Sequence, residues 1–227
     1  MDWNNDGKLD LISGDANGNV WVFINSGTKG APKLDEGKLV EADGKVIRAS
    51  REHYKQVDGN WVVDRVTTGS HILAQVYSKV HMADWDDDGL KDLLVGHETQ
   101  IIFYKNVGTP SKPRFLAPVV IPFPEGNHVS RPSPFVVDWD GDGLKDLLVG
   151  SETNIIRFYR NIGTSKEPVL DKEKVLELKG EGMDRWYRCR IDVTDWNNDG
   201  KLDILLGNFI SAMDMKSSGN IWLFLRE

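Results

Sequence analysis

A nine-residue acidic motif, D-W-D/N-x-D-G-x-x-D, occurs four times in this chain of 227 residues and constrains its fold more than any other feature. The copies are Asp2–Asp10, Asp84–Asp92, Asp138–Asp146 and Asp195–Asp203. Each copy is followed by a short apolar run that ends in glycine, and then by a second apolar and aromatic run. Repetition at such intervals is typical of arrays in which each repeat buries its apolar face against its neighbours.

The apolar runs predict about four short strands in each repeat. The Leu-Leu-Val runs that begin at Leu93 and Leu147 lack polar alternation, which predicts strands buried on both faces. A propeller blade packed between two neighbours provides such burial, whereas a β-sandwich would not predict one acidic loop per repeat. We therefore expect an all-β fold, a β-propeller of four-stranded antiparallel blades, with about four blades or as a fragment of a larger ring.

The repeats predict a single β-propeller region over residues 1–227. Its units are approximately 2–34, 71–122, 131–179 and 186–227, with an insertion at 35–70 in the first of them. A degenerate extra repeat without an acidic loop is an alternative for this insertion. No strand is expected before the first acidic loop, and none after the last apolar run. We expect a fragment of a longer propeller, or self-association with a partner copy that completes the ring.

Three repeats contain the pattern N-x-G-T-x-x-x-P, at Asn25–Pro32, Asn106–Pro113 and Asn161–Pro168. Asn and Gly tolerate positive φ and Pro fixes φ, so we expect a tight turn in which the Asn and Gly residues take positive φ.

Positions 1, 3, 5 and 9 of every acidic loop carry Asp or Asn, and position 7 can offer its backbone carbonyl. Ca²⁺ prefers about six to eight hard oxygen ligands at flexible geometry, which alternate residues of a tight loop supply. We therefore expect up to four Ca²⁺ ions as cofactors. The expected ligands are Asp2, Asn4, Asp6, Lys8 and Asp10; Asp84, Asp86, Asp88, Leu90 and Asp92; Asp138, Asp140, Asp142, Leu144 and Asp146; and Asp195, Asn197, Asp199, Lys201 and Asp203.

An EF-hand or a site for a different metal fits the acidic motif less well. An EF-hand needs a Glu at position 12, but Val95 and Val149 occupy that position inside strand-like runs. No Cys or His stands at a ligand position, which argues against zinc and copper, and Mg²⁺ prefers stricter octahedral sites. The remaining alternative is a set of solvated acidic turns that bind no metal. Four copies of the motif at the same place in the repeat disfavour it.

The motif, its strand context and the N-x-G-T turn resemble FG-GAP/VCBS repeats, the calcium-binding blades of integrin α-chain propellers and of many secreted bacterial proteins. The resemblance covers most of the chain outside residues 35–80. It implies calcium ions that stiffen the blade loops, with ligands engaged elsewhere, and a full ring of about seven or eight blades. It also implies an extracellular or cell-surface location.

Composition limits the partners. The net charge of −7 disfavours nucleic acid, and no apolar stretch is long enough to insert into a membrane as a helix. The chain opens on a charged loop without a signal peptide. The single cysteine, Cys189, lies in a strand-like run and is expected to be buried and inert.

Two functions remain open. The first is a calcium-stabilised, non-catalytic binding or scaffold module that recognises a glycan or a protein. The alternative is the catalytic propeller of a polysaccharide lyase that acts on an acidic polysaccharide, which the resemblance allows. Nucleophile-elbow, phosphate-loop, dinucleotide-binding and HExxH motifs are all missing, so no catalytic residue is assigned. Only His81 with Arg131 or Arg188 offers a base beside a cation.

Several residues outside the repeated pattern are candidates for ligand binding. The strands that lead into the acidic loops carry cations that can pair with acidic sugars, and non-repeated tryptophans can stack on sugar rings. The candidates are His81, Arg131, Arg188, Arg190, Trp61 and Trp186. The loop tryptophans are expected in the core instead, at Trp3, Trp85, Trp139 and Trp196.

Overall fold

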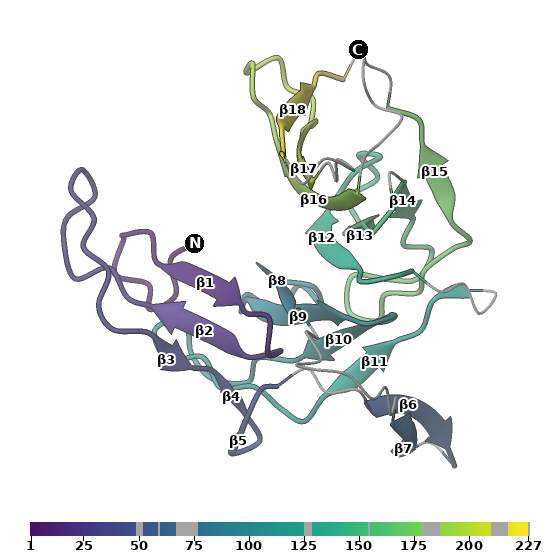
Figure 1. Ribbon diagram of the computed structural model, residues 1–227, viewed down its shortest axis with the longest axis horizontal. Coiled ribbons are helices and arrows are strands. Elements are labelled where there is room, and N and C mark those ends of the chain that lie inside the picture. Colours follow the sequence, from purple (N-terminus) through teal and green to yellow (C-terminus); the bar gives the residue numbers. More distant parts are fainter. Residues whose placement is uncertain are drawn as a thin grey trace. The chain divides into compact units, whose positions relative to one another are not determined.

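The computed structural model describes residues 1–48, 52–58, 60–66, 77–124, 129–153, 155–178, 187–209 and 218–226 (Figure 1). These residues contain β-strands and no helix, so no helix among them could cross a membrane. The chain forms two compact units, Met1–Pro122 and Phe123–Glu227, which are described separately.

The first unit contains the first two repeats. One sheet has the order β1 (Leu11–Gly14), β2 (Val20–Phe23) and β3 (Lys38–Leu39). The other has the order β11 (Val119–Ile121), β10 (Gln100–Tyr104), β9 (Asp92–His97) and β8 (Lys79–Ala83). Two small hairpins lie within the predicted insertion: β4 (Glu41–Ala42) with β5 (Lys45–Val46), and β6 (Glu52–Val57) with β7 (Asn60–Val66).

The second unit contains the third and fourth repeats. Its four-stranded sheet has the order β12 (Ser133–Val137), β13 (Asp146–Gly150), β14 (Ile156–Tyr159) and β15 (Lys174–Leu176). A three-stranded sheet follows, with β16 (Tyr187–Thr194), β17 (Asp203–Phe209) and β18 (Ile221–Phe224). The strands of each sheet lie side by side as simple meanders in Figure 1.

This topology confirms the predicted all-β fold with antiparallel, four-stranded blades. Every pairing between named strands is antiparallel. All residues of β9 and β13 are buried, as the unbroken Leu-Leu-Val runs predict. Each of these two strands is the second of its blade, and it follows the acidic loop directly.

Apolar side chains of neighbouring sheets form a shared core within each unit. In the first unit, Val20 and Val22 of β2 belong to the same cluster as Leu93 and Ile102 of the next sheet. In the second unit, Leu148 and Phe158 cluster with Leu206 of the fourth repeat. A blade thus buries its faces against the adjacent blade, which explains why its central strands carry little polar alternation.

A glycine allows the sheets to approach closely. β1 packs against β8, and a Cβ atom on Gly14 would collide with the carbonyl oxygen of Ser78 just before β8. β13 packs against β16, and a Cβ atom on Gly150 would lie 2.6 Å from the carbonyl oxygen of Cys189. The glycine that ends the apolar run therefore sets the distance to the strand of the following repeat.

The core position predicted for the loop tryptophans is correct for Trp85 and wrong for Trp196. Trp85 is buried, and Trp3 and Trp139 are partly buried against the two cores. Trp3 and Trp139 pack toward the repeat that follows their own, since Trp3 contacts Phe115 and Trp139 contacts Arg226. Trp196 is 57% exposed.

The N-x-G-T pattern forms the predicted turn, but for a different reason. The side-chain oxygen Oδ1 of Asn106 accepts the backbone N–H groups of Gly108 and Arg114 at 2.9 and 3.0 Å, which closes the turn. Asn25 and Asn161 make the equivalent bonds. Positive φ was expected at these Asn and Gly residues, and this is wrong. The glycine is needed because a Cβ atom would collide with a backbone oxygen across the turn.

Candidate metal centres

The four acidic loops share one backbone conformation. In the second loop, Asp84 accepts the N–H groups of Asp88 and Gly89, each at 3.0 Å, and the other three loops make the same pair of bonds. Glycine at position 6 has positive φ in all four copies. Position 4 also has positive φ, and the residues there are Asn5, Asp87, Gly141 and Asn198.

These bonds direct carboxylate oxygens toward one another. In the second loop, oxygens of Asp84, Asp86 and Asp88 all lie within 4.8 Å of one another. In the third loop, oxygens of Asp138, Asp140 and Asp146 do so. Oδ1 of Asp86 is buried and has no hydrogen-bond partner in the described part of the chain. A hard divalent cation such as Ca²⁺ suits this oxygen-only donor set.

The aspartate at position 9 is buried in every loop, and both of its oxygens accept backbone N–H groups. In the second loop, Oδ2 of Asp92 accepts the N–H of Trp85 at 3.1 Å, and Oδ1 accepts that of Asn106 at 2.8 Å. The same two bonds recur at the other copies, on Asp10, Asp146 and Asp203. Position 9 therefore joins the start of the loop to the turn that follows the second strand after the loop.

A basic residue lies against each of the two loops that have four carboxylates. Lys105 forms ion pairs with Asp86 and Asp88, the latter at 2.9 Å. Arg160 forms ion pairs with Asp140 at 2.6 Å and with Asp142 at 2.7 Å. Both cations immediately precede the Asn of the N-x-G-T turn.

The two loops with Asn at position 3 have an apolar residue at the equivalent place. Ile24 precedes Asn25, and Leu225 precedes Arg226, whose N–H takes the place of the Asn N–H. A cation thus stands at this place only where position 3 adds a carboxylate. The four loops divide into two charge classes: the loops with Asp at position 3, which the adjacent cation partly neutralises, and the loops with Asn there, which have no cation at this place.

The charges within the loops shift the pKa values of their members. Burial, with a smaller contribution from the nearby Asp86 and Asp88, raises the pKa of Asp92 to about 6. Burial also raises the pKa of Asp146. Hydrogen bonds to Asp86 and Asp88 raise the pKa of Lys105 above its usual value, so this residue stays charged. Buried like charges of this kind favour binding of a cation.

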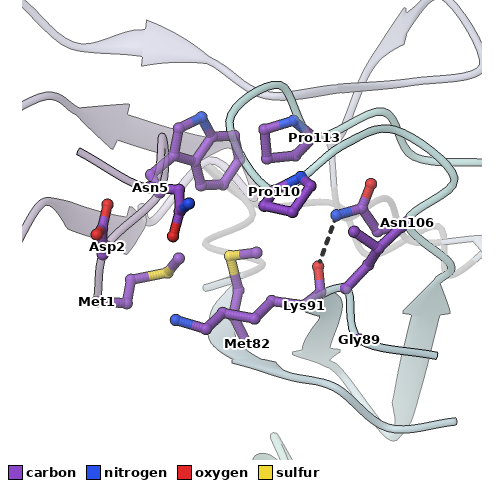
Figure 2. Close-up of a pocket in the computed structure, with 11 residues that line it drawn as sticks. Met1, Asp2, Asn5, Met82, Gly89, Lys91, Asn106, Pro110 and Pro113 are labelled. Atoms are coloured by element: carbon purple, nitrogen blue, oxygen red, sulfur yellow. Dashed lines mark hydrogen bonds between the residues drawn. The ribbon is translucent and has the colours of Figure 1, made fainter. Parts of the chain in front are cut away.

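A small hollow lies beside the first acidic loop, with a volume of about 110 Å³. Figure 2 shows Met1, Asp2 and Asn5 on one side of it and Met82, Pro110 and Pro113 on the other. Asn106 donates to the carbonyl oxygen of Lys91 at 3.1 Å at its edge. Such a volume suits a few water molecules rather than a sugar ring, so we assign no ligand to it.

The predicted ligand-binding residues are divided between the two units. His81 lies in β8 of the first unit, whereas Arg131, Arg188 and Arg190 lie in the second. Arg131 and Arg188 both contact Glu152. Trp61 lies in β7, and Trp186 lies outside the described residues. Pairing of His81 with an arginine stays a prediction.

Sequence reasoning identified the acidic loops but missed three of their features. Position 4 is Asn, Asp or Gly in each copy, and these residue types indicate positive φ because they tolerate the left-handed conformation. The cations Lys105 and Arg160 stand at equivalent positions in two repeats, a signal visible only after alignment of the repeats. The structural role of position 9 has no signal, because its partners are backbone N–H groups, which any residue type supplies.

Consecutive antiparallel meanders, with one acidic loop in each repeat, define a repeat protein of the β-propeller class. The sequence model of the FG-GAP-like repeat matches residues 84–149 and again residues 138–206. These overlapping matches cover more than half of the chain, which therefore belongs to the FG-GAP-like repeat family. The resemblance inferred from the motif is confirmed. A search of the curated proteins finds no match.

Proposed function

We propose that this chain is a calcium-stabilised, non-catalytic binding module of an extracellular or cell-surface protein, with a glycan or a protein as its ligand. The observation that supports it best is the acidic loop, in which carboxylate oxygens of Asp84, Asp86 and Asp88 converge within 4.8 Å. The loop recurs with the same hydrogen bonds in all four repeats.

Calcium fits these loops for chemical reasons. Their side-chain donors are carboxylate and amide oxygens, without sulfur or imidazole, and the ligands come from a short flexible loop. The loops of the second and third repeats each offer four carboxylates, and the first and fourth each offer three. Up to four Ca²⁺ ions would neutralise charges that otherwise repel one another.

Calcium in a loop would stabilise the whole blade. The loop connects the first and second strands of a repeat, and its buried aspartate is bonded to the residue after the third strand. An ion held by the loop therefore restrains three strands together. Ligand binding to the folded state alone raises stability by mass action.

Thermal unfolding with and without calcium tests the proposal. After removal of metal ions, we expect millimolar CaCl₂ to raise the melting temperature by several degrees, with a smaller effect of MgCl₂. Calorimetric titration should show saturable calcium binding. An unchanged melting temperature, together with no heat of binding, would contradict the proposal.

A matched pair of variants makes the test specific. Asp86→Asn removes one carboxylate from the second loop, whereas Asp43→Asn removes one from the β4–β5 turn outside the loops. Asp43 has positive φ, which Asn tolerates, so this control should leave both stability and calcium binding unchanged. Calcium-dependent stabilisation should decrease only in Asp86→Asn.

A further inference from the structure

The sheet of a repeat has two faces, a leading face toward the preceding repeat and a trailing face toward the following repeat. In the first unit, Val20 and Val22 on the trailing face of the first repeat cluster with Leu93 on the leading face of the second. In the second unit, Ile156 on the trailing face of the third repeat clusters with Ile204 on the leading face of the fourth. Within each unit, a trailing face therefore packs on a leading face.

The trailing face of the fourth repeat is exposed. The hydrogen bonds of the aspartate at position 9 align the repeats, and Ile221 and Leu223 of β18 then stand where the third repeat has Ile156 and Phe158. Ile156 and Phe158 are buried, whereas Ile221 is 81% exposed and Leu223 is also exposed. The fourth repeat thus keeps apolar residues at places that the third repeat covers.

The leading face of the first repeat is open in the same way. Leu11 follows the aspartate at position 9, as Leu93 and Ile204 do in the second and fourth repeats. Leu93 and Ile204 are buried, whereas Leu11 is 46% exposed. Leu11 pairs with Phe23 across the sheet, and this aromatic side chain is only half-buried. The first repeat therefore presents apolar residues on a face that the second and fourth repeats bury.

The loop tryptophans reveal a second pair of exposed partners. The rings of Trp3 and Phe115 lie 6.0 Å apart, which joins the first loop to the segment after the N-x-G-T turn of the second repeat, where Phe115 is buried. Leu34 is the equivalent of Phe115 in the first repeat, since each forms a bridge with the Asn of its turn. Leu34 is exposed, and so is Trp196 of the fourth loop. Each of these two residues offers one half of a contact that the first two repeats form.

We propose that the fourth repeat of this chain packs on the first repeat of a second copy, so that chains associate head to tail. Ile221 and Leu223 would lie against Leu11 of the second copy, and Trp196 against its Leu34. This interaction surface goes beyond the proposed binding of a glycan or a protein. It extends to a pair of chains the contact that already joins the first repeat to the second and the third to the fourth.

A second copy fits this surface better than an unrelated protein. The trailing face needs a leading face with an apolar residue at the start of its second strand and another after its N-x-G-T turn, and the chain presents both at Leu11 and Leu34. Burial of exposed apolar side chains favours association. Since the two faces differ, the contact is heterologous, and it either closes a ring of copies or extends without limit.

Sedimentation velocity over a range of protein concentrations, at constant millimolar calcium, tests the proposal. We expect the average mass of the wild type to rise with concentration. Ile221→Glu and Leu11→Glu should each weaken self-association by about tenfold or more, because the contact would bury a carboxylate among apolar groups. Ile162→Glu is the matched control, since Ile162 is an exposed isoleucine in the turn after β14, outside both faces.

The positions of these variants are exposed, so each variant should keep the melting temperature of the monomer. Leu34→Glu gives a second variant of the leading face if Leu11→Glu fails to fold. A wild type that stays monomeric at every concentration would overturn the proposal. Self-association that Ile221→Glu and Leu34→Glu leave unchanged would place the contact elsewhere and would overturn it as well.

A mixing experiment shows whether unlike faces meet. Ile221→Glu keeps an intact leading face, and Leu11→Glu keeps an intact trailing face. Each variant alone should be monomeric, whereas an equimolar mixture should form a dimer with one copy of each. This dimer should not grow, because both of its remaining faces carry the glutamate. A dimer of either variant alone would show that a face pairs with itself, which would contradict head-to-tail association.

The calcium proposal and this one can fail separately. Asp86→Asn alters the acidic loop of the second repeat, which belongs to neither exposed face. Well below its melting temperature, this variant should lose calcium stabilisation but still self-associate. Ile221→Glu should show the reverse pattern.

Discussion

The carboxylate of Asp92 accepts the backbone N–H of Asn106 at 2.8 Å, so the last residue of an acidic loop is fixed to the first residue of the turn that follows the third strand. Its second oxygen accepts the N–H of Trp85. The repeated motif thus contains two kinds of aspartate. In the second loop, Asp86 and Asp88 at positions 3 and 5 belong to the cluster of converging carboxylates. Asp92 at position 9 replaces backbone hydrogen bonds that the strands cannot make.

Replacement of Asp92 by Asn should destabilise the fold even without calcium. An amide has one acceptor oxygen, so one of the N–H groups of Trp85 and Asn106 would face the NH₂ group, at a cost of about 1–3 kcal/mol. Asp86→Asn should instead leave the metal-free protein nearly as stable as the wild type. Urea unfolding in chelator-treated buffer measures both. Similar midpoints for the two variants would contradict a separate structural role for position 9.

Lys105→Met should tighten calcium binding at the second loop by about tenfold, because a cation near the ligands repels a divalent ion by at least ~1 kcal/mol. Without calcium, the same variant should be less stable than the wild type, since Asp86 and Asp88 lose their counter-charge. Ile24→Met is the matched control at the equivalent position of the first repeat. Weaker calcium binding in Lys105→Met would show that the lysine assists the site.

The first loop allows the converse experiment. Asn4→Asp gives it the four carboxylates of the second and third loops, yet Ile24 supplies no cation. We expect tighter calcium binding by about tenfold and lower stability in chelator. Calorimetry and thermal unfolding of this variant, compared with Asp43→Asn, check both directions. A rise in metal-free stability would contradict the proposed role of charge.

Cys189 should be unreactive until the second unit unfolds. The thiol is fully buried, and burial raises its pKa to about 11. A raised thiol pKa means that the folded state keeps its proton longer, so stability is lost as the pH rises from about 9 to about 11. Reaction with a thiol reagent at pH 8 should be slow in buffer and fast in urea. Cys189→Ala should reduce the loss of stability at alkaline pH, and an unchanged pH profile would contradict the assignment.

The strands could be predicted because their apolar runs fit no other element. The run from Leu93 to Gly96 is buried on both faces and is flanked by an acidic loop, so its type and approximate ends follow from local sequence. Ligand positions could likewise be predicted, since alternate residues of one loop point to one centre. Both depend on residues close in sequence.

Features that depend on distant residues could not be predicted. Glu152 meets Arg188 only because a turn of the third repeat lies against the first strand of the fourth. Trp196 shares its motif with the buried Trp85 but is exposed, because burial of this side chain is decided by what packs on it. The sequence pattern of a repeat specifies its own strands. Its side-chain contacts with other repeats depend on the residues of the repeat that packs against it.

The close approach at Gly14 and Gly150 has a consequence for how such chains can evolve. Each glycine meets backbone atoms of the next repeat, at Ser78 and at Cys189, so this part of the contact does not depend on which side chain the next repeat carries there. A duplicated repeat that retains both the glycine and the segment equivalent to Ser78 or Cys189 contains both sides of this contact. Gene duplication can therefore lengthen the array one repeat at a time, and the outer loops can then diverge without a matching change in the adjacent repeat.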